Sequence, residues 1–111
     1  MDPPRTPFSV EHHAGASEHV LAVIGDIDIF TTSDFSAALE LSFGAKRVIV
    51  DLSRCGYIDS TGISTLFRWQ QSTEGKLRLV VGRQGKIRRI LQVTRVGDFI
   101  KIYPSVEEAK A

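Results

Sequence analysis

The sequence lacks the features that mark secreted, membrane-spanning or disulfide-linked proteins. Cys55 is its one cysteine, so no intrachain disulfide can form, and a lone cysteine is usual in a reducing compartment. Asparagine is absent, which excludes N-linked glycosylation. Residues 1–5 do not begin the apolar run of a signal peptide, and the longest unbroken apolar stretch, 20–24, is far shorter than a membrane span. We therefore expect a cytoplasmic protein with no membrane association.

An excess of charge of one sign is also missing. The 14 Lys and Arg residues and 13 Asp and Glu residues leave a formal net charge of +1, which gives no electrostatic reason to expect nucleic acid as a direct partner. Basic residues gather locally in one stripe, formed by Arg83, Lys86, Arg88 and Arg89. A solvated helix face explains this stripe more simply than an anion site. Whether the stripe has a ligand is not decided by the sequence.

The chain does contain enough apolar sequence for one core, since 42% of its 111 residues are hydrophobic. Three prolines among the first seven residues predict an extended lead-in over 1–7, followed by one domain over 8–111. Apolar residues then recur with the periods of strands and helices. The pattern predicts strands at 8–12, 19–25, 47–52, 77–81 and 100–103, a hairpin turn at 16–19, and helices at 31–44, 60–72, 87–97 and from 105 onward.

The predicted order of elements is β-β-α-β-α-β-α-β-α. Strands that alternate with helices are joined by right-handed crossovers and form a largely parallel sheet. The fold class is therefore α/β, a single domain with helices packed against a mostly parallel sheet. Binding loops of such sheets follow the strands. Four short stretches occupy such places here, at 25–28, 51–53, 59–62 and 82–84.

Several of these stretches carry a family resemblance. Residues 48–53 (VIVDLS), a short loop and residues 57–63 (YIDSTGI) resemble the signature of STAS domains, and more narrowly that of bacterial anti-sigma factor antagonists. Residues 25–28 (GDID) are similar to that family's Gly-Glu-Leu-Asp turn. Residues 87–91 with Val96 and Gly97 resemble its third helix and helix end. The resemblance extends from Phe8 to Ala109 and implies the fold of that family.

The resemblance also implies a phosphorylation switch. In that family, the serine after the aspartate is phosphorylated by a partner that is both an anti-sigma factor and a serine kinase. The unphosphorylated form binds this partner, the phosphorylated form releases it, and a phosphatase is a further implied partner. By motif position the acceptor here is Ser60, with Thr61 as its rival. The expected partner-binding residues are Asp26, Asp28, Asp59, Thr61 and Gly62.

The residues themselves are compatible with such a switch. Ser60 falls where a helix should begin, so its hydroxyl should be at the surface and within reach of a kinase. A phosphoryl group there adds about −1.5 to −2 charges, which a helix N-terminus tolerates. The neighbouring Asp59 would repel the group and present it outward, although Asp59 also fits a simpler role as a favourable charge near a helix start.

The other candidate residues have structural interpretations as well. Ser60 and Thr61 are suitable N-caps for the second helix. Asp26 and Asp28 are typical turn and cap residues. Gly62 is suited to a tight turn or to a close approach of the backbone to a neighbour, and we accept that interpretation. The sequence therefore offers each position two roles.

Enzymes are one alternative class. The chain has no Gly-x-Ser-x-Gly elbow, no histidine placed at a βα loop as a base and no Gly-rich phosphate loop. We therefore predict that the protein is not an enzyme and that it has no catalytic residue, no cofactor and no metal. Cys55, expected in the loop after 47–52, has no ligand partner at metal spacing. His12, His13 and His19 are expected at the surface of the first hairpin.

A second alternative is a STAS subunit that is not phosphorylated and serves as an assembly piece of a transporter or a multiprotein signalling complex. Two departures from the family pattern bear on this choice. Phe30 is bulky where small residues are frequent, and Arg54-Cys55 is unusual in its loop. Both are expected to alter the choice of partner, so the sequence does not identify the sigma factor, the kinase or the stimulus.

Overall fold

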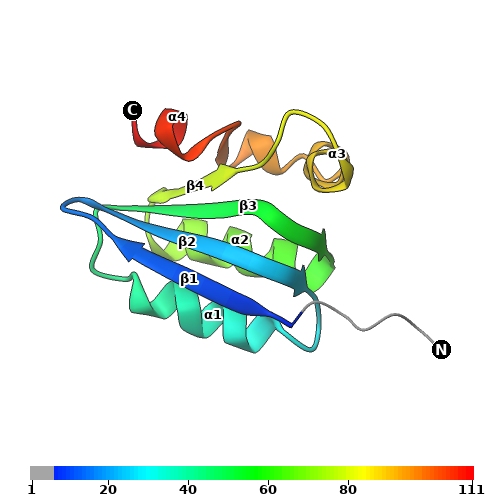
Figure 1. Cartoon of the computed structure of the whole chain (residues 1–111), viewed down its shortest axis with the longest axis horizontal. Coiled ribbons are helices and arrows are strands. Elements are labelled where there is room, and N and C mark those ends of the chain that lie inside the picture. Colours follow the sequence, from blue (N-terminus) through cyan, green and yellow to red (C-terminus); the bar gives the residue numbers. More distant parts are fainter. Residues whose placement is uncertain (1–6) are drawn as a thin grey trace.

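The computed structural model describes residues 7–111 (Figure 1). Of the predicted lead-in over 1–7, residues 1–6 lie outside the described part. The elements follow one another in the predicted order, and the α/β class is confirmed. The strands are β1 (Ser9–Ala14), β2 (Glu18–Ile27), β3 (Arg47–Ile58), β4 (Leu77–Val80) and β5 (Lys101–Tyr103); the helices are α1 (Thr32–Leu41), α2 (Ser60–Ser72), α3 (Lys86–Val93) and α4 (Val106–Lys110), with a 3-10 turn η1 (Val96–Asp98).

The five strands form one sheet in the order β1-β2-β3-β4-β5. β1 pairs antiparallel with β2, and every other pair of neighbours is parallel. A parallel strand must return to the sheet through a crossover, so β2, β3 and β4 each lead into a helix. The carboxyl ends of these strands face the same way, and α1, α2 and α3 begin there (Figure 1). We call this side of the sheet the carboxyl edge.

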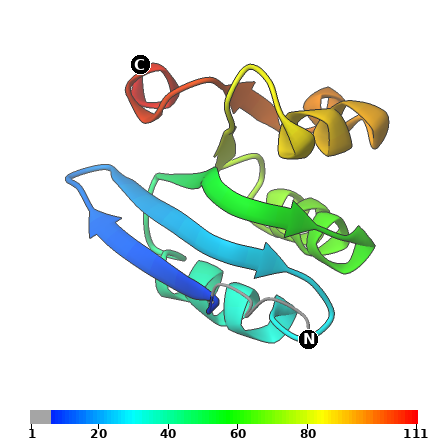
Figure 2. The same cartoon turned by 45° about the vertical axis from the view of Figure 1, so that its right-hand side comes forward.

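The two faces of the sheet are covered unequally. Side chains alternate along a strand, and Leu21 and Val50 belong to the main core cluster, which includes side chains of α1, α2 and α3. The intervening side chains of Val20 and Ile49 form a smaller cluster with Ala109 of α4. Figure 2 shows α1 along β1 and β2, with α4 at the opposite side of the molecule. Each fully buried Leu, Ile or Val contributes about 1.5–3 kcal/mol.

Strand β3 corrects one prediction. The sequence predicts a strand over 47–52 and then a loop, whereas β3 continues to Ile58. The ten-residue β2 offers a partner along this extra length, and two register shifts between the strands absorb the irregular residues. Cys55 accordingly lies in a strand rather than a loop and is only 7% exposed. Burial raises the pKa of its thiol.

Smaller differences concern the ends of elements. The hairpin turn covers 15–17 rather than 16–19, because β2 already begins at Glu18. Of the two residues that could face the core at the end of α1, Ser42 is buried and Phe43 is exposed. Trp69 packs at the edge of the core, with its ring 6.2 Å from that of Phe43. None of the helices within residues 7–111 is long and apolar enough to cross a bilayer.

Candidate functional site

Helix α2 is capped by Asp59. The backbone of Asp59 is extended, and its Oδ1 accepts hydrogen bonds from the backbone N–H groups of Thr61 (2.9 Å) and Gly62 (3.2 Å). Such a carboxylate satisfies N–H groups that have no partner within the helix, and it faces the positive end of the helix dipole. The capping role that the sequence offers to Ser60 and Thr61 therefore belongs to Asp59, one residue earlier.

Asp59 also links α2 to the end of β2, where the loop to α1 begins. Its N–H donates to the carbonyl of Ile27 (3.0 Å). Burial raises the pKa of Asp59, but the hydrogen bonds from the Thr61 hydroxyl and from the backbone of Gly62 and Thr61 outweigh it, so this pKa lies below its ordinary value. Asp59 thus joins the start of α2 to the end of β2 through its backbone, while its ionised carboxylate caps the helix.

The two candidate phosphoacceptors have different surroundings. Thr61 is half-buried, and its hydroxyl donates to Oδ1 of Asp59 at 2.5 Å. A phosphoryl group on Thr61 would break this bond and bring two anions together. Ser60 is the first residue of α2 and is exposed, and its hydroxyl forms no hydrogen bond to any of residues 7–111. Ser60 is therefore the more accessible of the two hydroxyls.

Gly62 lies where α2 comes closest to the sheet. A Cβ atom at this position would be 2.7 Å from Cγ2 of Ile27 and 2.7 Å from Cγ1 of Ile58. This distance is far inside van der Waals contact, so the close-approach interpretation of Gly62 is confirmed. Because Gly62 is buried, it acts on the surface only by allowing the start of α2 to lie against β2 and β3.

The loop between β2 and α1 is held by its own hydrogen bonds. Asp28 is 9% exposed, and its Oδ1 accepts from the backbone N–H groups of Phe30 (2.9 Å) and Thr31 (3.2 Å). The Thr31 hydroxyl donates to the carbonyl of Asp26 (2.7 Å) and accepts from the N–H of Asp28 (2.9 Å). Asp28 is thus a turn-forming residue, as one of its two predicted roles requires. Contact of Asp26 and Asp28 with a partner stays a prediction.

The sequence assigned neither Ile29 nor Tyr57, both at the carboxyl edge, to a site. Ile29 is 68% exposed and stands next to Phe30, which is 80% exposed. Tyr57, at the end of β3, is 39% exposed, and the Nζ atom of Lys86 lies 4.8 Å from its ring centre. Two large apolar residues in a row within a turn are unusual, so the Ile29-Phe30 pair is a signal that the sequence already contained.

The basic stripe lies at the start of α3. The guanidinium of Arg88 donates to the carbonyls of Gly82 (2.9 Å) and Val81 (3.1 Å). Arg83 and Arg89 form no ion pair with any of the residues that the structure describes. Together with Lys86 and neighbouring residues, these arginines line a hollow of about 460 Å³. The exposed cations agree with a solvated helix face.

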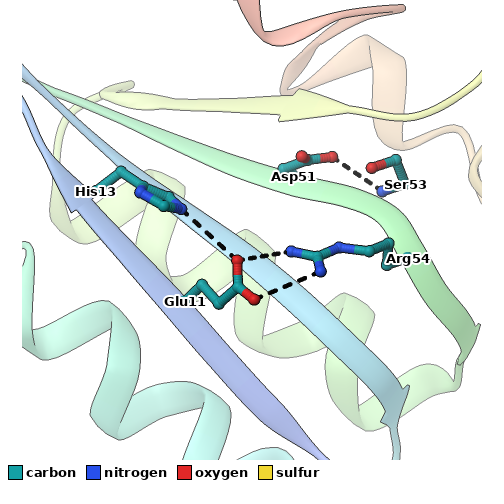
Figure 3. Close-up of polar contacts among 5 residues, drawn as sticks. All are labelled: Glu11, His13, Asp51, Ser53 and Arg54. Carbon is teal, nitrogen blue, oxygen red and sulfur yellow. Dashed lines mark hydrogen bonds and ion pairs between the residues drawn. The ribbon is translucent and has the colours of Figure 1, made fainter.

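Another polar group lies on the sheet itself (Figure 3). Arg54 of β3 reaches across β2 to Glu11 of β1, with two hydrogen bonds of 2.8 and 3.4 Å, and His13 lies 3.7 Å from the same carboxylate. The hydrogen bond from Arg54 and its charge lower the pKa of Glu11. These side chains are about half exposed, so the pairs add little stability. The group connects two strands at the surface.

The histidines lie away from the carboxyl edge. His12 and His13 are exposed on β1, as predicted, while His19 at the amino end of β2 is half-buried. Nδ1 of His12 lies 3.3 Å from Nε2 of His19. Within residues 7–111, no three His, Cys, Asp or Glu side chains are grouped so as to hold a metal ion.

Comparisons with known proteins agree with the observed fold. A family model described as STAS domain matches residues 8–109. An anti-sigma factor antagonist from Mycobacterium paratuberculosis has a TM-score of 0.85 at 19% identity, with 93% of this chain and 91% of that chain covered. The anti-sigma factor antagonist SpoIIAA in its unphosphorylated form has a TM-score of 0.68 at 18% identity, with 93% of this chain and 92% of that chain covered. The Bacillus cell fate determinant SpoIIAA in its phosphorylated form has a TM-score of 0.65 at 18% identity, with 93% of this chain and 96% of that chain covered.

Proposed function

The chain belongs to the STAS domain family, and from this premise we propose that it is an anti-sigma factor antagonist switched by phosphorylation of Ser60. The unphosphorylated form binds an anti-sigma factor that is also a serine kinase, the phosphorylated form releases it, and a phosphatase restores binding. The chain is then a binding module and not an enzyme, a cytoplasmic phosphoprotein of bacterial transcription regulation. The similarity in fold to anti-sigma factor antagonists supports the proposal.

The observation that carries the proposal is the Ser60 hydroxyl, which forms no hydrogen bond to any of residues 7–111. It is exposed, it begins a helix, and the neighbouring hydroxyl of Thr61 is engaged by Asp59. A kinase can therefore reach Ser60 without opening the fold. Asp59 remains the cap after phosphorylation, because its bonds do not involve the Ser60 side chain.

The phosphoryl group changes the surface rather than the fold. It adds about −1.5 to −2 charges at the N-terminus of α2, where the helix dipole tolerates an anion. The same charge within a complementary interface costs on the order of 2–5 kcal/mol. This corresponds to a loss of affinity of tens- to thousands-fold, which is enough to dissociate a complex of ordinary strength.

The direct test is to incubate the purified chain with its kinase and ATP and to locate the added phosphate by fragmentation mass spectrometry. We expect the phosphate on Ser60, and no incorporation into Ser60→Ala. Ser64→Ala is the matched control, because Ser64 is also exposed on α2 but lies one turn further along. This control should be phosphorylated like the parent.

Phosphate on Thr61, or on neither residue, contradicts the assignment. A chain that stays bound to a larger assembly whether or not ATP is present would instead fit the alternative, a STAS subunit that is not phosphorylated.

A further inference from the structure

The loop between β2 and α1 exposes more apolar surface than a turn needs. Ile29 and Phe30 are 68% and 80% exposed and are consecutive. No other two large exposed apolar side chains among residues 7–111 are consecutive; Phe43 and Phe99 each pack against another aromatic ring, of Trp69 and Phe67 respectively. Scattered exposed residues need no explanation, but contiguous ones favour a contact with another molecule.

Hydrogen bonds fix the backbone of Phe30 and of the segment that precedes the pair. The N–H of Phe30 donates to the Asp28 carboxylate, and the carbonyl of Ile27 accepts from the N–H of Asp59. The carbonyl of Asp28 accepts from Thr31 at 3.1 Å. A fixed loop loses little conformational freedom on binding, so its apolar side chains can contribute most of their burial to affinity.

The apolar pair and Ser60 belong to one surface. The carbonyl of Ile27, two residues before Ile29, accepts a hydrogen bond from the N–H of Asp59, the residue directly before Ser60 (3.0 Å). The ends of β2 and β3 are also paired at this point, with Ile27 opposite Ile58. A partner that covers Ser60 therefore also meets Ile29 and Phe30.

We propose that Ile29 and Phe30 are the apolar anchor of this surface, inserting into an apolar cleft of the anti-sigma factor. This inference rests on the proposed function and adds a mechanism to it. Docking of the anchor removes water from the neighbouring Ser60, and a neutral hydroxyl accepts this far more easily than a phosphate dianion. Phosphorylation then releases the partner chiefly because the phosphate cannot be desolvated beside the anchor.

The test is a calorimetric titration of unphosphorylated variants with the kinase that modifies the parent chain. We expect Phe30→Ala to bind at least about tenfold more weakly than the parent, as buried aromatic anchors do. Ile29→Ala should weaken binding less. Leu41→Ala and Val93→Ala are matched controls with equally exposed apolar side chains away from this surface, and they should bind like the parent. All four should keep the melting temperature of the parent.

Salt separates desolvation from charge repulsion. Repulsion by the partner's charges is screened at high ionic strength, whereas the desolvation of a phosphate next to an apolar cleft is not. We expect the ratio of affinities of the unphosphorylated and phosphorylated parent to change less than about threefold between 0.1 and 1 M salt. This ratio should shrink in Phe30→Ala, because water then has access to the phosphate.

The outcomes distinguish the two proposals. If the parent binds and Phe30→Ala binds equally well, the anchor is wrong while the proposed function stands. A parent that dimerises through this turn, with unchanged affinity of Phe30→Ala for the kinase, also overturns the anchor. If the parent does not bind the kinase at all, both proposals fail.

Discussion

Helices α2 and α3 both begin at the carboxyl edge of the sheet, but their first turns differ. α2 has an aspartate cap, an exposed serine as its first residue and a buried glycine pressed against β2 and β3. α3 begins after Gly85, has no side-chain cap and carries cations in its first turn. Cations at a helix N-terminus oppose the dipole, whereas the Asp59 carboxylate complements it.

The two helix starts differ in how a charge added to the first residue of the helix would be received. The start of α2 is bonded to the neighbouring loop through Asp59, so a new charge on Ser60 meets a fixed backbone. The start of α3 is held by hydrogen bonds from the Arg88 guanidinium to the carbonyls of Val81 and Gly82, and by Lys86 over Tyr57. A rigid surface whose charge can change is what an affinity switch requires. The following predictions test this contrast, from the largest effect to the smallest.

Glycine substitutions should destabilise both helix starts, for different reasons. Gly62→Ala should lower the free energy of unfolding by about 1–3 kcal/mol, because its Cβ would overlap Ile27 and Ile58. Gly85→Ala has free space but a φ of +106° that suits only glycine, and it should also cost about 1–3 kcal/mol. Urea denaturation measures both. Gly44→Ala, which has no atom within 4 Å and no positive φ, is the control. If Gly62→Ala had the same free energy of unfolding as the parent, α2 would not be pressed against the sheet.

Loss of the α2 cap should have the next largest effect. Asp59→Ala should lower the free energy of unfolding by about 0.5–2 kcal/mol, while Asp59→Asn, which can still accept the backbone hydrogen bonds, should lose less. The pKa of Asp59 is lower in the folded chain, so its stabilising contribution is complete above the ordinary carboxyl pKa of about 4 and is lost as the pH falls through the folded value. Denaturation between pH 3 and 6 should therefore show that the free energy of unfolding falls more steeply with falling pH for the parent than for Asp59→Asn. Equal slopes would contradict the assigned cap.

Charge at the first residue of each helix should have the smallest effect. Ser60→Asp should raise the free energy of unfolding by about 0.3–1 kcal/mol, since a carboxylate there suits the dipole. Lys86→Asp gains the same favourable interaction with the helix dipole but loses the contact with Tyr57, worth about 0.5–1 kcal/mol. The net change in its free energy of unfolding should therefore be close to zero. Thermal unfolding compares the two. A marked destabilisation by Ser60→Asp would show that the fold does not tolerate charge at this position.

The sequence predicted most of the fold because its apolar periods and turn residues agree with the final structure. It placed the start of α2 at Ser60 correctly but offered the cap to Ser60 and Thr61, because neighbouring Asp, Ser and Thr are all good caps and only the backbone geometry separates them. The length of β3 was missed because it depends on β2, a segment remote in the sequence. The position of the loop that carries Ile29 likewise depends on a remote residue, because the N–H of Asp59 donates to the carbonyl of Ile27.

The central claim is that charge on Ser60, and not refolding, controls partner binding. The most direct measurement is a calorimetric titration of the anti-sigma factor with the parent, with the Ser60-phosphorylated chain and with Ser60→Ala, each checked for equal far-ultraviolet circular dichroism. We predict that the parent and Ser60→Ala bind with equal affinity, because Ser60 caps nothing, and that the phosphorylated chain binds at least about tenfold more weakly. A phosphorylated chain that is folded and binds as tightly as the parent would contradict the account.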